Sequence, residues 1–239
     1  MASSFARVLF CLAGFLALRL AAAETYAPFR PDLPAGAAYR IDAAQLHPTQ
    51  FSVGLREVRY KRAAIDKFDA AQLAAYLQDK DVPLVIGPGG VPYLTDGHHP
   101  ISALLASAQA DKTVYGHVLA NWADLTPAAF WARMQEKKLT YLKDAAGRPQ
   151  PPERLPATLR EMQHDIYRGL AWAGVKGGGF AASKPPAGDF QEFFWADFFR
   201  GRLQWNDADE KDFARVLAEA LALARSPAAA GLPGYRGAP

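Results

Sequence analysis

Two adjacent histidines, His98 and His99, stand in the segment Thr95–Pro100, which reads Thr-Asp-Gly-His-His-Pro. Imidazole groups donate hydrogen bonds to phosphate, transfer protons near neutral pH and bind metals. Asp96 could orient one of these rings or bind a divalent cation. Adjacent residues of a helix do not share a face. We therefore expect one histidine to face a pocket and the other to be structural, which disfavours a metal site built from both.

The two histidines lie where a predicted strand, residues 91–95, meets a predicted helix. Gly97 permits a tight turn and the close approach of a ligand, and Pro100 stands at the predicted first helical position. A helix start carries unpaired N–H groups and the positive end of the helix dipole, so it is a natural anion site. The simpler alternative is that Asp96 caps the helix, Gly97 only turns the chain, and the histidines are solvated. We favour a phosphate site at this junction.

A basic cluster follows the predicted strand over 51–58. It consists of Arg56, Arg59, Lys61 and Arg62. Positive side chains near a phosphate site neutralise charge that develops in a transition state, and Arg56 and Arg59 are the candidates for this role. The alternative is a solvated edge of the fold, and the sequence favours neither.

The elements around these residues predict an α+β fold, in which a small mixed sheet with packed helices precedes a helical C-terminal extension. Alternating or apolar runs predict strands over 51–58, 82–86, 91–95 and 114–119, with a hairpin turn at 87–90. Helical spacing and caps predict helices after Asp69, Gly97 and Thr126, and then over 159–172, 190–199 and 206–224. We divide the chain into a signal peptide (1–23), an irregular N-terminal arm (24–45), an α+β domain (46–146), a helical extension packed on it (156–225) and a disordered tail (226–239).

The first 23 residues have the pattern of a secretory signal peptide. Arg7 precedes the apolar run 8–18, and the small residues 21–23 precede Glu24. The apolar run is too short to span a bilayer, which needs about 20 residues. A retained anchor is the alternative, which Arg19 keeps open. Cleavage predicts a periplasmic or secreted protein without a transmembrane segment.

Cleavage would also remove Cys11, the single cysteine of the chain. The mature protein would then contain no disulfide and no cysteine nucleophile. Loss of Arg7 and Arg19 lowers the formal net charge from +3 to +1. Domains that bind nucleic acid usually have a pI above about 9, so any contact with nucleic acid must come from a local patch.

On these residues the chain resembles the ParB-like nuclease family of the ParB/sulfiredoxin superfamily. The segment 93–104 stands where the superfamily has a strand leading into a Gly-x-x-Arg helix start that holds nucleotide phosphates. The resemblance covers most of residues 46–202, and its stretches are 46–50, 66–77, 82–86, 93–105, 114–119, 167–172 and 190–200. It implies a phosphate pocket on a mixed α+β scaffold.

Two positions depart from the pattern of the superfamily. Sulfiredoxin has a cysteine beside this histidine, where the chain has His98, so sulfinic-acid reduction is not expected. The arginine that follows the histidine in the superfamily is replaced by Pro100, which removes a bidentate phosphate ligand. We expect Arg56 and Arg59 to supply the lost contacts, and Gly97 and His98 to complete the phosphate site.

The resemblance implies a nuclease or phosphodiester hydrolase that acts on nucleic acid or a nucleotide, and the predicted signal peptide implies that it is exported. His99, or else His98, would be the general acid or base, and Asp96 would orient it or bind Mg²⁺ or another divalent metal. One alternative is a nucleotide-dependent small-molecule kinase of the same superfamily, which export disfavours because nucleoside triphosphates are scarce outside the cytoplasm. The other is a non-enzymatic module that binds an anion, or a partner through the aromatic segment Phe190–Phe199.

Overall fold

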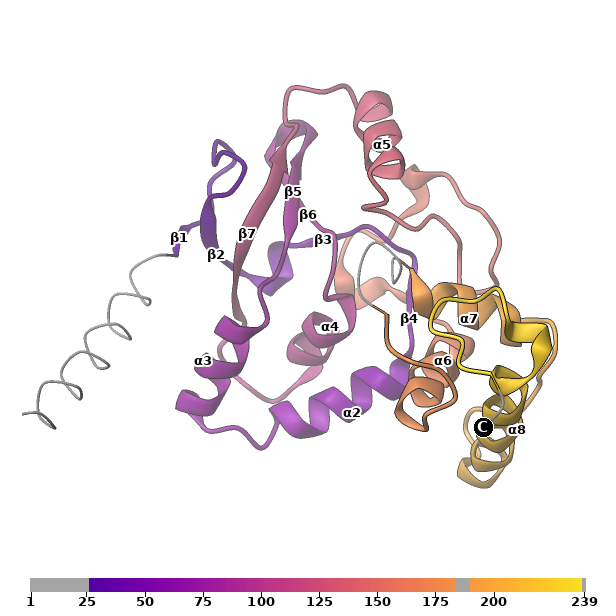
Figure 1. Ribbon diagram of the computed structural model, residues 1–239. Helices are drawn as coiled ribbons and strands as arrows, with labels where there is room; N and C mark the ends of the chain where they lie inside the picture. Colours follow the sequence, from indigo (N-terminus) through magenta and orange to yellow (C-terminus); the bar gives the residue numbers. More distant parts are fainter. Residues whose placement is uncertain (1–25, 184–189, 238–239) are drawn as a thin grey trace, which may run out of the picture.

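A computed structural model describes residues 26–183 and 190–237, so the predicted signal peptide lies outside the described residues. A six-stranded mixed sheet forms the centre of the N-terminal part of the molecule (Figure 1). Its strands, in spatial order, are β1 (Ala27–Pro28), β2 (Ala38–Asp42), β7 (Thr113–Asn121), β5 (Leu84–Gly87), β6 (Val91–Leu94) and β3 (His47–Pro48). Helices pack on both faces of this sheet, which confirms the predicted α+β fold.

The pairing of the strands brings distant segments to the start of one helix. Strands β5 and β6 form the predicted antiparallel hairpin, with the turn at Pro88–Gly90. Strand β3 pairs with β6 in parallel, so the chain that leaves β3 runs past the end of β6. There the hydroxyl of Thr49 donates to the carbonyl of Leu94 at 2.7 Å. The next helix in the chain begins immediately after this point.

The two faces of the sheet are covered by different helices. Leu84 and Ile86 face one side of β5 and Val85 faces the other, because successive side chains alternate along a strand. The first side packs against α2 (Leu55–Ile65), α3 (Ala70–Asp79) and α4 (His98–Ala106). The second side packs against α5 (Pro127–Glu136).

The C-terminal helices build a second apolar core beside the sheet. They are α6 (Ile166–Lys176), α7 (Gln191–Arg200) and α8 (Glu210–Arg225). Trp195 lies at the centre of this core and stacks on Phe180 with ring centroids 3.8 Å apart. A short parallel pair, β4 (Ser52–Val53) with β8 (Gln163–His164), joins this part to the first. None of the described helices is both long and apolar enough to cross a membrane.

The predicted strand over 51–58 is wrong. Only Ser52–Val53 is extended, and helix α2 begins at Leu55, directly after Gly54. Leu55, Val58 and Ile65 share one face of this helix and pack on the core of the sheet, which is the helical spacing. The alternation of apolar and polar residues over 51–58 had suggested a strand instead. Glu57 is therefore part of helix α2 rather than of a strand.

The two predicted irregular ends are also wrong where the structure describes them. The arm over 24–45 contributes β2 to the sheet, where Tyr39 and Ile41 are buried at alternate positions. The tail over 226–239 forms a 3₁₀ turn at Pro227–Ala229. It then returns to α7, where the carbonyl of Pro233 accepts from the Trp195 indole at 2.8 Å. The proline and glycine content of both segments suggested irregular chain, but apolar residues in each of them are buried.

Candidate functional site

Helix α4 begins with the two histidines, two residues before Pro100, the predicted first helical position. Gly97 precedes them with φ of +87°, a left-handed conformation that suits glycine. This turn sends the chain from β6 into the helix. The His98 and His99 side chains are buried, with residue exposures of 4 % and 7 %, so neither is solvated.

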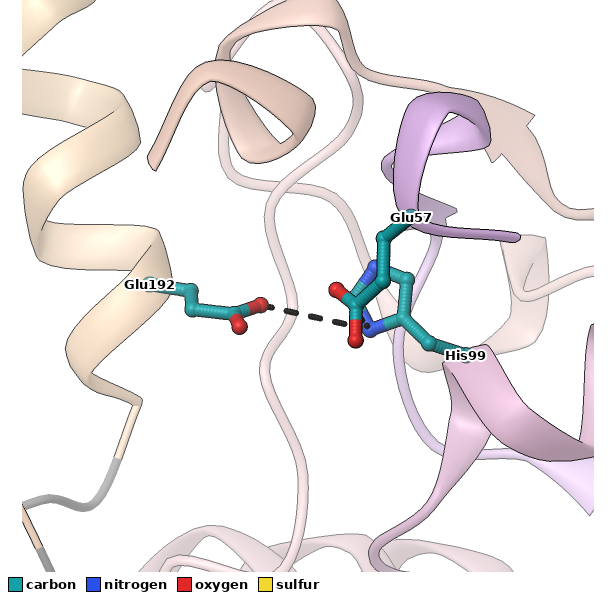
Figure 2. Close-up of side chains that lie close together, drawn as sticks. All are labelled: Glu57, His99 and Glu192. Carbon is teal, nitrogen blue, oxygen red and sulfur yellow. Dashed lines mark ion pairs between the residues drawn. The ribbon is translucent and has the colours of Figure 1, made fainter. Parts of the chain in front are cut away.

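His99 faces two carboxylates that come from distant helices. Its Nδ1 is 3.3 Å from Oε2 of Glu57 on α2 and 3.9 Å from Oε2 of Glu192 on α7. Figure 2 shows Glu57 beside the ring and Glu192 reaching toward the same edge of the ring from the left. The three side chains therefore form one cluster at the meeting point of α2, α4 and α7, which we call the Glu57–His99–Glu192 cluster.

The backbone fixes the tautomer of His99. The amide N–H of Gly54 donates to Nε2 at 3.0 Å, and a neutral imidazole that accepts at one nitrogen carries its proton on the other. The proton of His99 is thus on Nδ1, which is the atom that faces Glu57 and Glu192. The ring is oriented as a hydrogen-bond donor toward the two carboxylates.

Arg168 of α6 completes the cluster with a buried positive charge. Its Nη2 donates to Oε2 of Glu192 at 3.0 Å, and its Nη1 donates to the carbonyl of Ser52 at 3.3 Å. The guanidinium carbon lies 3.7 Å from the centroid of the Phe193 ring. The side chain is 4 % exposed, so its charge acts in a poorly solvated environment, where electrostatic interactions are strong.

Several polar atoms around the cluster lack a partner. Oε2 of Glu57 and Nε of Arg168 are buried and form no hydrogen bond, and the same holds for the hydroxyls of Ser52 and Ser102. Ser52 adjoins Arg168, and Ser102 lies one turn after His98 on α4. Buried polar groups are almost always hydrogen-bonded in proteins. Their concentration here indicates a place that accommodates water, an ion or a polar ligand.

The cluster shifts the ionisation of its own members. Burial, with a further contribution from the charge of Glu192, raises the pKa of the Glu57 carboxyl to about 7, although Lys61 opposes this rise. Burial and the charge of Arg168 hold the pKa of His99 well below its ordinary value. At neutral pH the imidazole is therefore neutral, and the Glu57 carboxyl exchanges its proton readily. A pKa near the working pH is what general acid–base chemistry requires.

His98 points away from this cluster. Its Nε2 accepts from the amide of Thr49 at 3.2 Å, which ties α4 to the chain that leaves β3. Burial, followed by the charge of Arg168, lowers the pKa of His98 to about 3. The two adjacent histidines thus diverge, and the structure gives His98 contacts that hold the fold. Its predicted roles in catalysis and phosphate binding are not supported by any contact that we observe.

Asp96 is not brought to either histidine. The residue is exposed, and its Oδ1 accepts from the amide of Gly97 at 2.7 Å. The acidic groups at His99 are instead Glu57 and Glu192. The predicted roles of Asp96 as the orienting residue and metal ligand therefore lack a geometric basis in the described residues. Gly97 supplies the turn, and its predicted contact with phosphate stays a prediction.

The two predicted phosphate-binding arginines lie on another side of α2. Arg56 donates to Asp207 at 2.8 Å and to Glu210 at 3.0 Å. These contacts dock α2 on the beginning of α8 and commit the guanidinium. Arg59 is exposed and lines a cavity of about 500 Å³ that His164 and Asp207 also line. Neither arginine is observed in contact with the Glu57–His99–Glu192 cluster.

The Glu57–His99–Glu192 cluster could hold a metal ion, since one ligand atom from each residue lies within 4.8 Å of the others. Carboxylate oxygens suit Mg²⁺ and Mn²⁺, and Oε2 of Glu57 is buried without a partner. The imidazole fits less well. A ligating histidine usually donates its other N–H to an acceptor, whereas Nε2 of His99 accepts from Gly54. The two carboxylates are therefore the better ligands.

Sequence reasoning missed Glu57 as a site residue and gave Glu192 only part of its role. Glu57 fell within the predicted strand, so its position on the buried face of α2 was hidden. Glu192 pairs with Arg168 at 3.0 Å, and Asp197 on the same helix pairs with Arg200 at 3.6 Å. The available signal was an acidic residue in an apolar helical stretch. It does not indicate which distant histidine that residue meets.

Comparison with known proteins places this geometry in a family. A family model described as "Putative ParB-like nuclease" matches residues 39–201, which include all members of the cluster. A similar solved structure is protein Atu1540 from Agrobacterium tumefaciens, with 35 % sequence identity and a TM-score of 0.75. The match covers 84 % of this chain and 97 % of that chain. No match was found among curated proteins. The chain belongs to the ParB-like nuclease family.

Proposed function

We propose that this protein hydrolyses phosphodiester bonds in nucleic acid, with the Glu57–His99–Glu192 cluster and Arg168 as its reactive centre. The observation that carries the proposal is the buried, unpartnered Oε2 of Glu57, which lies 3.3 Å from Nδ1 of His99. A carboxylate in this setting is costly to the fold unless a ligand or a proton compensates it. Family membership supplies the reaction class.

In the proposed reaction Glu57 is the general base. Its carboxylate takes a proton from a water molecule as the water oxygen bonds to phosphorus and the P–O bond to the leaving group breaks. The leaving oxygen takes a proton from solvent water, and Glu57 returns the proton it accepted to solvent. At pH values above the Glu57 pKa of about 7, the carboxyl is ionised and can accept this proton. The Nδ1–H of His99 faces both carboxylates, 3.3 Å from Glu57 and 3.9 Å from Glu192, and orients the site.

Arg168 offsets the negative charge of the phosphate in this proposal. Its Nη2 is committed to Glu192, but its Nε is without a partner. A guanidinium in a poorly solvated site stabilises developing charge on phosphoryl oxygens. A divalent cation held by Glu57 and Glu192 would supply further positive charge and a water of lowered pKa, and Glu57 would then be a ligand rather than the base.

The test is cleavage of labelled single- and double-stranded oligonucleotides by the purified protein, with Mg²⁺ or Mn²⁺ and with a chelator. Glu192→Gln keeps the shape of the side chain but removes its charge, and we expect cleavage to fall about 100-fold or more. Asp197→Asn is the matched control, because it lies on the same helix with similar side-chain exposure, 31 % against 29 %. The control should cleave like the wild type.

Cleavage that survives Glu192→Gln unchanged would overturn the proposal and point to a contaminating nuclease. Equal losses in Glu192→Gln and Asp197→Asn would indicate damage to α7 rather than loss of a reactive group. Cleavage that persists in the chelator would remove the cation from the proposal and leave Glu57 as the base.

We also propose that the protein is exported. The support is the pattern of residues 1–23, where Arg7 precedes a short apolar run and small residues follow it. Fusion of this segment to an export-dependent reporter should give reporter activity outside the cytoplasm. Retention of the fusion in the cytoplasm would contradict export and favour the nucleotide-dependent kinase alternative.

A further inference from the structure

An aromatic pair, one ring exposed and the other half-buried, lies where helices α2 and α6 meet. The helices approach so closely that a Cβ on Gly54 would stand 2.5 Å from the backbone nitrogen of Gly169. Tyr60 of α2 and Trp172 of α6 face each other across this contact, with ring centroids 5.2 Å apart. Tyr60 is 59 % exposed, although it is a large apolar side chain. The pair therefore offers an aromatic surface to solvent.

This aromatic pair is continuous with the reactive centre. Arg168, Trp172 and Lys176 recur at every fourth position of α6, so they lie along one side of the helix. At 1.5 Å per residue, the row extends about 12 Å from Arg168 in the cluster to Lys176 at the surface. On α2, Tyr60 follows Glu57 by one turn. The surface that Tyr60 and Trp172 form thus begins beside the cluster.

This surface carries positive charge that the protein does not neutralise. Of the six basic residues on α2 and α6, four form ion pairs within the protein, namely Arg56, Lys61, Arg62 and Arg168. Glu57 is the single acidic residue of the two helices, and it is buried. Lys176 places its Nζ 5.5 Å from the centroid of the Tyr60 ring. Among the described residues, neither Lys176 nor Arg59 forms an ion pair, so both charges are available to a ligand.

An anionic ligand with flat apolar faces fits this combination. Single-stranded nucleic acid presents unpaired bases that stack on aromatic side chains, and its phosphates follow basic residues. In a duplex the bases are stacked on one another, so their faces cannot reach Tyr60 and Trp172. We propose that the α2–α6 surface binds single-stranded nucleic acid, with a base on Tyr60 and Trp172 and a phosphate at Lys176. This inference rests on the proposed function and names its substrate class.

The test is equilibrium binding of a fluorescent single-stranded oligonucleotide to the purified protein in a chelator, with a gel to verify that the oligonucleotide stays intact. We expect tighter binding than to the matching duplex. Tyr60→Ala should weaken binding about 10-fold, since a base stacked on an aromatic side chain contributes about 1–3 kcal/mol. Tyr60→Phe keeps the aromatic ring and should bind with the affinity of the wild type. Tyr60 is largely exposed, so the thermal unfolding of Tyr60→Ala should resemble that of the wild type.

The salt dependence tests the phosphate contact. Lys176→Gln should reduce the slope of log K against log salt by about 0.7, the effect of one phosphate contact in a single strand. Lys137→Gln is the matched control, because this exposed lysine lies at the end of α5 on the other face of the sheet. The control should leave the slope unchanged.

Undiminished binding by Tyr60→Ala, equal affinity for the duplex, or no binding at all would overturn this inference. The outcome is separable from that of the proposed function. Binding that depends on Tyr60 without any cleavage would support the surface and refute the nuclease. Cleavage that depends on Glu192 but not on Tyr60 would support the nuclease and refute the surface.

Discussion

Helix α2 meets the C-terminal helices through two polar networks that differ in one respect. On one side, Asp207 accepts from the Arg56 side chain at 2.8 Å, from the Trp205 indole at 3.2 Å and from His164 at 3.1 Å. On the other side, Glu57 lies beside His99 and its Oε2 has no hydrogen-bond partner. Both networks contain a histidine, an arginine and carboxylates. In the first network the carboxylate oxygens of Asp207 are hydrogen-bonded, whereas in the second Oε2 of Glu57 is not.

The ionisation of the two carboxyls reflects this difference. Burial alone would raise the pKa of Asp207, but the hydrogen bonds from Arg56, His164 and Trp205 outweigh burial and hold it below its ordinary value. Burial raises the pKa of Glu57 to about 7 because its partners do not compensate. The same residue types therefore dock a helix where every polar atom is paired, and leave a reactive group where some are not.

The largest expected effect is a loss of cleavage when the network around Glu57 is changed. Glu57→Gln removes the proposed base, so cleavage should fall about 100-fold or more. Stability should change little, because the amide removes a poorly solvated charge whose Oε2 has no hydrogen bond, although Lys61, 3.2 Å from Oε1, loses a charged partner. Cleavage assays and thermal unfolding of the same preparation check both parts. A Glu57→Gln protein that cleaves normally would refute the role of Glu57 in the reaction.

The opposite pattern is expected in the network around Asp207. Asp207→Ala removes the carboxylate partner of Arg56, whose side chain is 10 % exposed and keeps Glu210 and the backbone carbonyl of residue 207. Breaking a buried ion pair costs about 3 kcal/mol, so the free energy of unfolding in urea should fall by about this amount. Cleavage per folded molecule should remain that of the wild type. Unchanged stability would show that this network does not dock α8.

The pH dependence of stability should differ in sign between the two carboxyls. Glu57 binds its proton more tightly in the folded state, with a pKa of about 7 against an ordinary 4.5. Raising the pH through this window should lower the unfolding free energy by about 3 kcal/mol through Glu57, and Glu57→Gln should remove this loss. Asp207 has a lowered pKa, so its contribution is present above its unfolded pKa and is lost as the pH falls.

Urea titrations of wild type, Glu57→Gln and Asp207→Asn from about pH 2.5 to about pH 7.5 measure these differences, since the Asp207 contribution is lost only below its unfolded pKa of 3.8. The comparison of variants isolates each group from the other titrating residues. If the wild type and Glu57→Gln show the same pH dependence, Glu57 does not have a raised pKa in the folded protein.

The smallest effect is expected at the residue that sequence reasoning chose. Asp96→Asn changes an exposed side chain whose observed contact is the amide of Gly97. Surface substitutions of this kind change stability by less than about 0.5 kcal/mol, and cleavage should remain that of the wild type. A large loss of cleavage in Asp96→Asn would restore the predicted metal or orienting role of Asp96.

The predictable parts of this molecule are those that local sequence encodes. Asp69 and Gln72 form the capping box that starts α3, and Gly87–Gly90 with its proline turns the β5–β6 hairpin. The junction at Gly97 and His99 was found because glycine before two histidines is a local signal. These features depend on neighbours within a few residues, so a single sequence reveals them.

The carboxylates of the site depend on tertiary packing instead. Glu57 reaches His99 because α2 packs on α4, and Glu192 reaches it because α7 packs on α6. No local pattern encodes which faces of these helices meet. The basic character of Arg56 was visible in the sequence, but its commitment to Asp207 was not. The sequence thus identified His99 as a site residue, whereas its contacts with the two carboxylates became visible only in the structure.

The central claim is that Glu57, with its raised pKa, is the base of a phosphodiester hydrolase. The dependence of kcat/KM for oligonucleotide cleavage on pH tests it most directly. The account predicts that the rate rises with pH, with a midpoint near the Glu57 pKa of about 7, and that the residual cleavage of Glu57→Gln lacks this rise. A wild-type profile that is flat between pH 5 and pH 8, or one that Glu57→Gln retains, would contradict it.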